Sequence, residues 1–148
     1  MQKTAFTVLL MVIVILSGVA YTAEKTMPTT CKQCNKKIAE ADIKFAVYIP
    51  GGIEPSSFDD IGCAVVWYNT ECAMRQSAFD NYAIAHDYVT GAPIPVEKAF
   101  YVSSPDVKTP KGYGIVAFST KEEARKFADK QESARVLNYQ DVTSLKLE

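Results

Sequence analysis

The stretch FDDIGCA at residues 58–64 is matched later in the chain by FSTKEEA at residues 118–124. Each stretch has a phenylalanine, a helix-capping residue two positions further on, and an alanine four positions after that. The capping residues are Asp60 and Thr120, because side-chain oxygens of Asp and Thr accept hydrogen bonds from the free N–H groups of a first helical turn. Thr120 is followed three residues later by Glu123, which is the capping-box pattern. The two stretches predict two helices that begin in the same way.

Strand patterns flank both predicted helices. Apolar alternation and turn residues predict strands near residues 44–49, 83–89, 98–102, 113–118 and 134–139. A further strand is predicted to end near Phe58, just before the first helix. The first helix is predicted from Ile61 to about Arg75. Each helix is followed by a predicted strand that contains a tyrosine, Tyr88 in the first half and Tyr139 in the second. We interpret the pattern as two related ββαβ units, an internal duplication whose competing explanation is chance similarity over seven positions. The predicted fold class is α+β, in one compact domain.

The N-terminus has the pattern of a secretory signal peptide. Lys3 precedes an apolar run at residues 5–16, and the small residues that follow suit cleavage after Ala20. An uncleaved N-terminal anchor is the alternative, because the apolar stretch is at the short end for a membrane span. The sequence therefore predicts export to the periplasm.

The remaining chain has the size of one domain. Residues 1–20 are predicted as signal peptide or anchor, 21–30 as a polar linker and 31–148 as the domain. Without the leader the chain has 15 basic and 17 acidic residues, which gives no electrostatic indication of nucleic-acid binding. A hydrophobic content of 48% supports a packed core.

Cys31 and Cys34 form a C-x-x-C pair at the start of the domain. Thiolates are soft donors that suit copper(I), and a pair near a flexible start is expected to close around an ion. The same spacing also occurs in structural disulfides and in redox-active pairs, so three interpretations stay open from the residues alone. The redox interpretation lacks the expected helix in a βαβ context.

Two further cysteines lie in or near the first predicted helix. Cys63 falls in the first helical turn, where thiol pKa values are lowered, but its apolar neighbours make core packing the first expectation. Cys72 and Met74 form a C-x-M pair that shares an ion only if the helix has already ended before it. We treat this pair as a secondary copper site.

His86 is the single histidine of the chain. Imidazole is a good copper ligand, although a lone strand histidine is more often a packed or solvent-facing residue. With one histidine and no Ser/His/Asp arrangement, the sequence does not indicate an enzyme.

Several motifs in order resemble one family. They are the Cys31/Cys34 pair followed by FDDIGC (58–63), HDYVTG (86–91), AFYV (99–102) and TPKGYGIVAF (109–118). Together they resemble the accessory proteins of nitrous oxide reductase, the NosL family, over residues 31 to about 142. The resemblance implies two ββαβ units and a periplasmic copper(I) chaperone, usually membrane-tethered, that supplies the reductase. It also implies a sulfur-rich copper site of Cys and Met, with His as a further contributor.

The chain departs from the family pattern in three places. Asn35 and Lys36 follow Cys34 where the family has Gly-Met, and Lys111 stands where it has Met. The lipid-bearing N-terminal cysteine of most members is also missing. Two thioethers expected to bind copper are therefore replaced by lysines.

The predicted function is that of a copper(I)-binding protein that passes its ion to a recipient copper protein such as nitrous oxide reductase. The predicted ligands are Cys31 and Cys34, with His86, Met74 and Cys72 as candidates that complete the set. The alternatives are a periplasmic thiol redox protein that uses the Cys31/Cys34 pair and a structural domain with one disulfide.

Overall fold

The computed structural model of the chain describes residues 27–148. The predicted leader, residues 1–20, and most of the predicted linker lie outside the described residues. No helix among residues 27–148 is long and apolar enough to cross a membrane.

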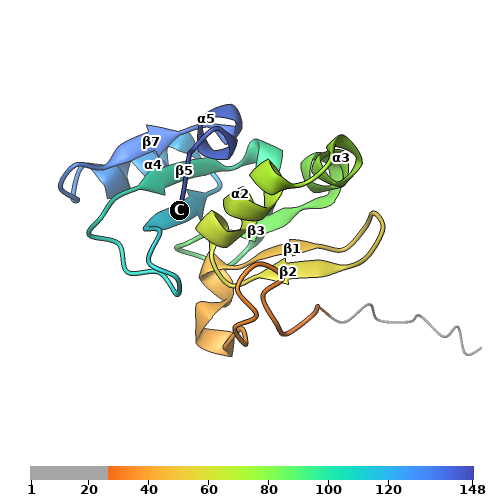
Figure 1. The fold of residues 1–148 in the computed structure, drawn as a ribbon. Helices are drawn as coiled ribbons and strands as arrows, with labels where there is room; N and C mark the ends of the chain where they lie inside the picture. The colour runs from red at the N-terminus through yellow and green to blue at the C-terminus, as the bar shows by residue number, and fades with distance from the viewer. Residues whose placement is uncertain (1–26) are drawn as a thin grey trace, which may run out of the picture.

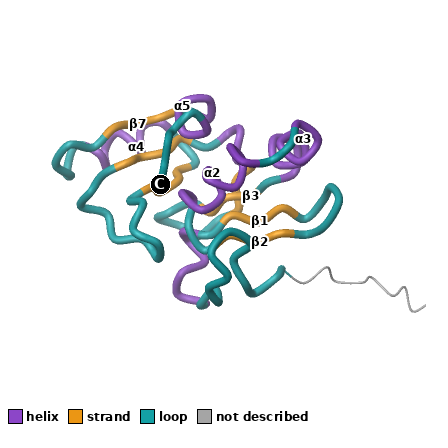
Figure 2. Tube along the Cα trace, in the orientation of Figure 1, coloured by secondary structure: helices purple, strands orange, loops and turns teal. Residues whose placement is uncertain are grey.

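The elements follow one another as two groups (Figure 1). The first group contains η1 (Glu40–Phe45), β1 (Val47–Ile49), β2 (Ser56–Phe58), α2 (Ile61–Thr70), α3 (Ala73–Tyr82), β3 (Ile84–His86) and β4 (Pro93–Pro95). The second group contains η2 (Val96–Lys98), β5 (Phe100–Ser103), β6 (Ile115–Phe118), α4 (Lys121–Ala128), β7 (Arg135–Leu137) and α5 (Tyr139–Thr143). The strands are short, and loops make up much of the chain between them (Figure 2).

Both groups build an antiparallel sheet with the same strand order. The first sheet is ordered β2-β1-β3-β4 and the second β6-β5-β7, so the first strand of each unit lies between its second and third. The register also matches, because Val47 pairs with Phe58 in one sheet and Phe100 with Phe118 in the other. The predicted α+β class and the two ββαβ units are confirmed.

The two predicted caps are also found in the structure. Asp60 Oδ1 accepts from the Gly62 N–H at 2.8 Å at the start of α2. Thr120 Oγ1 accepts from the Glu123 N–H at 3.2 Å at the start of α4. Each cap fixes the point at which a strand end turns into a helix, which in the first unit positions the candidate site.

The prediction of one helix from Ile61 to about Arg75 is wrong. Helix α2 ends at Thr70, the backbone is extended at Glu71, and α3 begins at Ala73. The Thr70 hydroxyl donates to the carbonyls of Val66 and Trp67, a local bond that competes with continuation of a helix. The break lets α3 fold back so that Phe79 packs against Trp67, with ring centroids 6.3 Å apart.

Three other expectations need correction. Tyr88 lies in the turn after β3 and Tyr139 begins α5, so neither tyrosine lies in a strand. The short strand β4 was not predicted, because its two prolines argue against strand structure. Proline is tolerated there because β4 is the edge strand of its sheet.

The two units share one core region. Residue 87, just after β3, forms a parallel bridge with Ala117 of β6, and the Tyr88 N–H donates to the Ala117 carbonyl at 2.8 Å. Phe45 of η1, in the first half, packs with Val102 and Phe118 of the second sheet. The described chain is therefore one compact domain.

Candidate metal centre

The C-x-x-C loop is held against the first sheet by backbone hydrogen bonds. The Cys31 N–H donates to the Lys36 carbonyl at 2.8 Å, and the Asn35 N–H donates to the Cys31 carbonyl at 2.9 Å. Asn35 has a φ of 58°, a left-handed conformation that asparagine tolerates better than most residues. The Lys32 N–H donates to the Ser57 carbonyl of β2 at 2.8 Å. The pair is thus part of a hydrogen-bonded loop, which corrects the expectation of a clip free to close around an ion.

The end of β2 and the start of α2 bring two more side chains to this loop. Asp59 precedes the capping Asp60, and Cys63 lies in the first turn of α2. The Sγ atoms of Cys31, Cys34 and Cys63 and one carboxylate oxygen of Asp59 all lie within 4.8 Å of one another. Within residues 27–148 this is the one group of three or more His, Cys, Asp or Glu side chains close enough to share a metal ion.

The four side chains differ in their access to solvent. Cys31 and Cys63 are fully buried and Asp59 is 1% exposed, whereas Cys34 is half-buried. All four cysteines of the chain are free thiols. A metal ion in this group would therefore meet solvent or a partner at Cys34.

The group favours one thiolate and two thiols at neutral pH. Hydrogen bonding by the Cys63 thiol lowers the pKa of Cys31 to about 6, and the backbone amides of Asp59 and Cys34 add to this effect against the opposing effect of burial. The same hydrogen bond to Cys31, together with burial, raises the pKa of Cys63. Burial chiefly raises the pKa of Cys34.

Asp59 is a buried carboxylate with weak hydrogen-bond partners. The Cys34 thiol donates to its two oxygens at 3.5 and 3.6 Å. No N–H or O–H donor to this carboxylate occurs in the described part of the chain, and thiols are weak donors. A buried anion with such partners is unfavourable by itself. A cation among the three sulfurs would offset that cost, so the residues present fit a metal ion.

A second loop covers the start of α2 beside the thiols. Asp60 Oδ2 accepts from the Thr109 hydroxyl at 2.6 Å and from the Lys111 N–H at 2.9 Å. A Cβ on Gly62 would lie 2.1 Å from Cγ of Tyr113, so only glycine lets this ring pack on the helix. Burial, followed by the charges of Cys63 and Asp60, raises the pKa of Tyr113. The ring therefore packs on the start of α2, one residue before Cys63.

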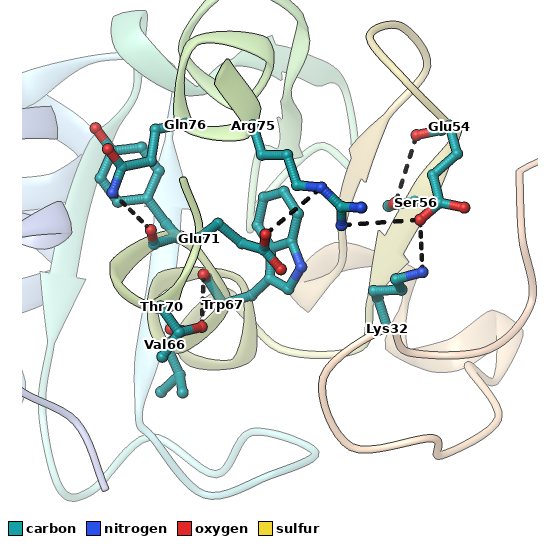
Figure 3. A network of polar contacts seen from close by, with 10 residues as sticks. Lys32, Glu54, Ser56, Val66, Trp67, Thr70, Glu71, Arg75 and Gln76 are labelled. Atoms are coloured by element: carbon teal, nitrogen blue, oxygen red, sulfur yellow. Dashed lines mark hydrogen bonds and ion pairs between the residues drawn. The ribbon is translucent and has the colours of Figure 1, made fainter. Parts of the chain in front are cut away.

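Surface ion pairs connect the C-x-x-C loop to its neighbours (Figure 3). Lys32 Nζ lies 2.6 Å from Glu54 Oε1, and Arg75 lies 4.0 Å from the same oxygen and 3.5 Å from Glu71. Figure 3 shows Lys32 and Arg75 reaching Glu54 from the loop and from α3, respectively. Exposed pairs of this kind contribute little energy, so the loop is held chiefly by its backbone hydrogen bonds.

The structure does not bring the other sequence-predicted ligands to this group. His86 lies at the end of β3 with Nδ1 3.2 Å from the Ala46 carbonyl oxygen. Cys72 is the exposed residue before α3, and Met74 is 65% exposed in the first turn of that helix. Cys31 and Cys34 are brought together, while His86 and Cys72 lie outside the group.

Two residues of the group were not among the ligands predicted from the sequence. Cys63 was expected to pack in the core, and it does, but its sulfur also faces Cys31. Asp59 was passed over beside the capping Asp60. The available signal was that both lie at the same helix N-terminus, next to a strand end.

A largely buried group of three thiols and one carboxylate on a small α+β domain is the kind of site that suits a soft metal ion. The NosL family model matches residues 22–147, and the chain belongs to the NosL family. The crystal structure of the copper chaperone NosL from Shewanella denitrificans has a similar fold, with a TM-score of 0.58 and 14% sequence identity. That match covers 82% of this chain and 95% of that chain. No match was found among curated proteins.

Proposed function

We propose that the protein binds one copper(I) ion as cargo on Cys31, Cys34 and Cys63 and delivers it to a copper enzyme outside the cytoplasm. The observation that carries the proposal is the cluster of three sulfurs within 4.8 Å of one another. Membership of the NosL family and the fold likeness to a copper chaperone support it. Residues 1–20 would serve as signal peptide or anchor, and the recipient would be an enzyme such as nitrous oxide reductase. The role is that of a binding protein rather than an enzyme.

The ligand set suits a monovalent soft ion. With metal–sulfur bonds of about 2.3 Å, three sulfurs around a trigonal ion are spaced by about 4 Å. Copper(I) is selected by thiolates, and a low coordination number leaves no position that His86, Met74 or Cys72 must fill. The Asp59 carboxylate is a harder donor than the thiolates. It lies beside the sulfurs, where its negative charge stabilises the bound cation electrostatically.

Delivery would begin at Cys34. This sulfur is the half-buried one, while Cys31 and Cys63 are buried. A thiol or thioether of the recipient would replace Cys34 first, and the other two sulfurs would hold the ion until further donors replace them. Each step exchanges one sulfur ligand for another, so no electron is transferred.

The experiment that tests this function is a copper(I) titration of the reduced chain against a colorimetric chelator. We expect one equivalent to be taken from the chelator by the wild-type chain and none by a Cys31→Ser/Cys34→Ser double variant. The matched control is Cys72→Ser, which removes an exposed thiol outside the group and should bind as the wild type does. Uptake that survives the double substitution would contradict the proposal. Failure of the wild type to compete, with a readily exchanged Cys31–Cys34 disulfide, would favour the thiol redox alternative.

Copper(I) affinity is expected to rise with pH. Because the pKa values of Cys34 and Cys63 are raised, both thiols are protonated at neutral pH and must release their protons when the ion binds. Above the Cys31 pKa of about 6, two released protons correspond to about a 100-fold gain in affinity per pH unit. Chelator competition between pH 6.5 and 8, corrected for the titration of the chelator, measures this slope. An affinity independent of pH would show that the thiols are already ionised.

A further inference from the structure

The loop after β3 repeats the geometry of the C-x-x-C loop. Asp87 N–H donates to the Ala92 carbonyl at 2.8 Å, as Cys31 N–H does to Lys36. Gly91 N–H donates to the Asp87 carbonyl at 2.8 Å, as Asn35 N–H does to Cys31 at 2.9 Å. The fifth residue has a positive φ in both loops, 73° at Gly91 and 58° at Asn35. Residues 87–92 and 31–36 therefore share one backbone conformation.

The two loops also contact equivalent strands. Cys31 forms a parallel bridge with Ser57, and Asp87 forms a parallel bridge with Ala117. The N–H of the following residue donates to that strand residue's carbonyl at 2.8 Å in both units. Ser57 and Ala117 each precede the phenylalanine of the duplicated stretch. The duplication thus extends to the loop, and Cys31 corresponds to Asp87.

The remaining ligand positions follow from the same correspondence. In the aligned loops, Cys34 is equivalent to Thr90. In the aligned duplicated stretches, Asp59 is equivalent to Ser119 and Cys63 to Glu123. None of the second-unit residues is a cysteine.

Both units direct the same backbone donors at the loop's first side chain. The amides of Cys34 and Asp59 interact with the Cys31 sulfur. The amides of their counterparts donate to the Asp87 carboxylate, from Thr90 at 2.9 Å and from Ser119 at 2.7 Å. We call this pair of converging amides the anion cradle. In the first unit it faces the Cys31 sulfur, and in the second it holds the Asp87 carboxylate.

We infer that the second unit contains a closed counterpart of the metal centre, in which Asp87 occupies the Cys31 position and the cradle holds an internal carboxylate in place of a metal-binding sulfur. The inference rests on the proposed function only in treating the first site as a metal centre. The Asp87 oxygens are saturated, because the Thr90 and Ser119 hydroxyls and the Val89 N–H also donate to them at 2.8–3.0 Å. Within residues 27–148 the first unit therefore carries the one candidate metal centre of this kind.

The test transfers the second-unit residues to the first unit. A Cys31→Asp/Cys34→Thr/Asp59→Ser variant copies the Asp87, Thr90 and Ser119 set. We expect it to melt within about 5 °C of the wild type and to bind no copper. The matched control is Cys31→Asn in the same background, because an amide of the same shape presents donors and no charge to the cradle. Burying an Asn side chain ordinarily costs less free energy than burying a charged Asp. An Asp variant that melts higher than the Asn variant would therefore show that the cradle amides stabilise an anion at position 31.

The reverse transfer gives a second readout. An Asp87→Cys/Thr90→Cys/Ser119→Asp/Glu123→Cys variant should raise the copper(I) content to one equivalent more than the wild type. The inference is overturned if the Asn variant melts as high as the Asp variant, or if the folded reverse variant gains no equivalent. A wild-type chain that binds no copper would contradict the proposed function, whereas the order of the Asp and Asn variants needs no metal.

Discussion

Replacement of Cys63 by serine is expected to lower the copper(I) affinity of the reduced chain by more than about 100-fold, since loss of an outer partner alone commonly costs a metal site 10–100-fold. The Cys63 sulfur lies within 4.8 Å of Cys31 and Cys34, and its removal leaves two thiolates and a hydroxyl that copper(I) binds poorly. The serine hydroxyl keeps a donor beside the Cys31 sulfur, so the expected loss of affinity comes from the missing sulfur ligand. Chelator competition at one fixed pH measures the affinity.

A matched pair separates a ligand role from a structural one. Cys72→Ser changes the other helix-associated cysteine, which is exposed and outside the group, and should leave the affinity unchanged. The melting temperature of the metal-free Cys63→Ser variant reports how much the core is disturbed, because Cys63 is fully buried. A folded Cys63→Ser variant with wild-type affinity would reduce the ligand set to the C-x-x-C pair.

The sequence was sufficient to predict the frame of the fold. The capping side chains of Asp60 and Thr120 act through local backbone donors, so a seven-residue pattern reveals both helix starts. Helix α2 ends at Thr70, where the hydroxyl bonds to carbonyls one turn back, and propensity alone does not show this end. Strand β4 depends on pairing with β3 and has no pattern of its own.

The candidate site could be predicted only in part. Cys31 and Cys34 are neighbours in the chain, and their spacing indicates a shared role. Asp59 and Cys63 join them because the loop pairs with β2 across 26 residues, from Cys31 to Ser57, and spacing along the chain does not reveal such a contact. His86 was expected near the site because of its chemistry, but it ends β3 with its ring against the Ala46 carbonyl and lies outside the group.

Replacement of Asp87 by alanine is expected to lower the free energy of unfolding by about 3 kcal/mol, which corresponds to a melting temperature lower by about 10 °C. The side chain is 1% exposed and accepts five hydrogen bonds from Val89, Thr90 and Ser119. Without it, five N–H and hydroxyl donors of Val89, Thr90 and Ser119 lose the acceptor that they share. The matched control is Asp106→Ala, because Asp106 is exposed and accepts one hydrogen bond, from the Glu132 N–H, within the same half of the chain as Ser119.

The Asp87 contribution should also depend on pH in a defined direction. Burial by itself would raise the pKa of Asp87, but hydrogen bonds from Thr90 and Ser119 outweigh it and lower the pKa from 3.8 to about 2. A carboxyl with a lower pKa in the folded than in the unfolded state stabilises the fold above the unfolded pKa, and that stabilisation is lost as pH falls through the folded pKa. Urea unfolding of the wild type and of Asp87→Ala should therefore show a constant difference from pH 7 to about 5. The difference should shrink by about 2 kcal/mol as the pH is lowered from about 4 toward 2. A difference that stays constant over the acid range would mean that the carboxylate charge contributes nothing, and that the aspartate acts in this junction only through its shape.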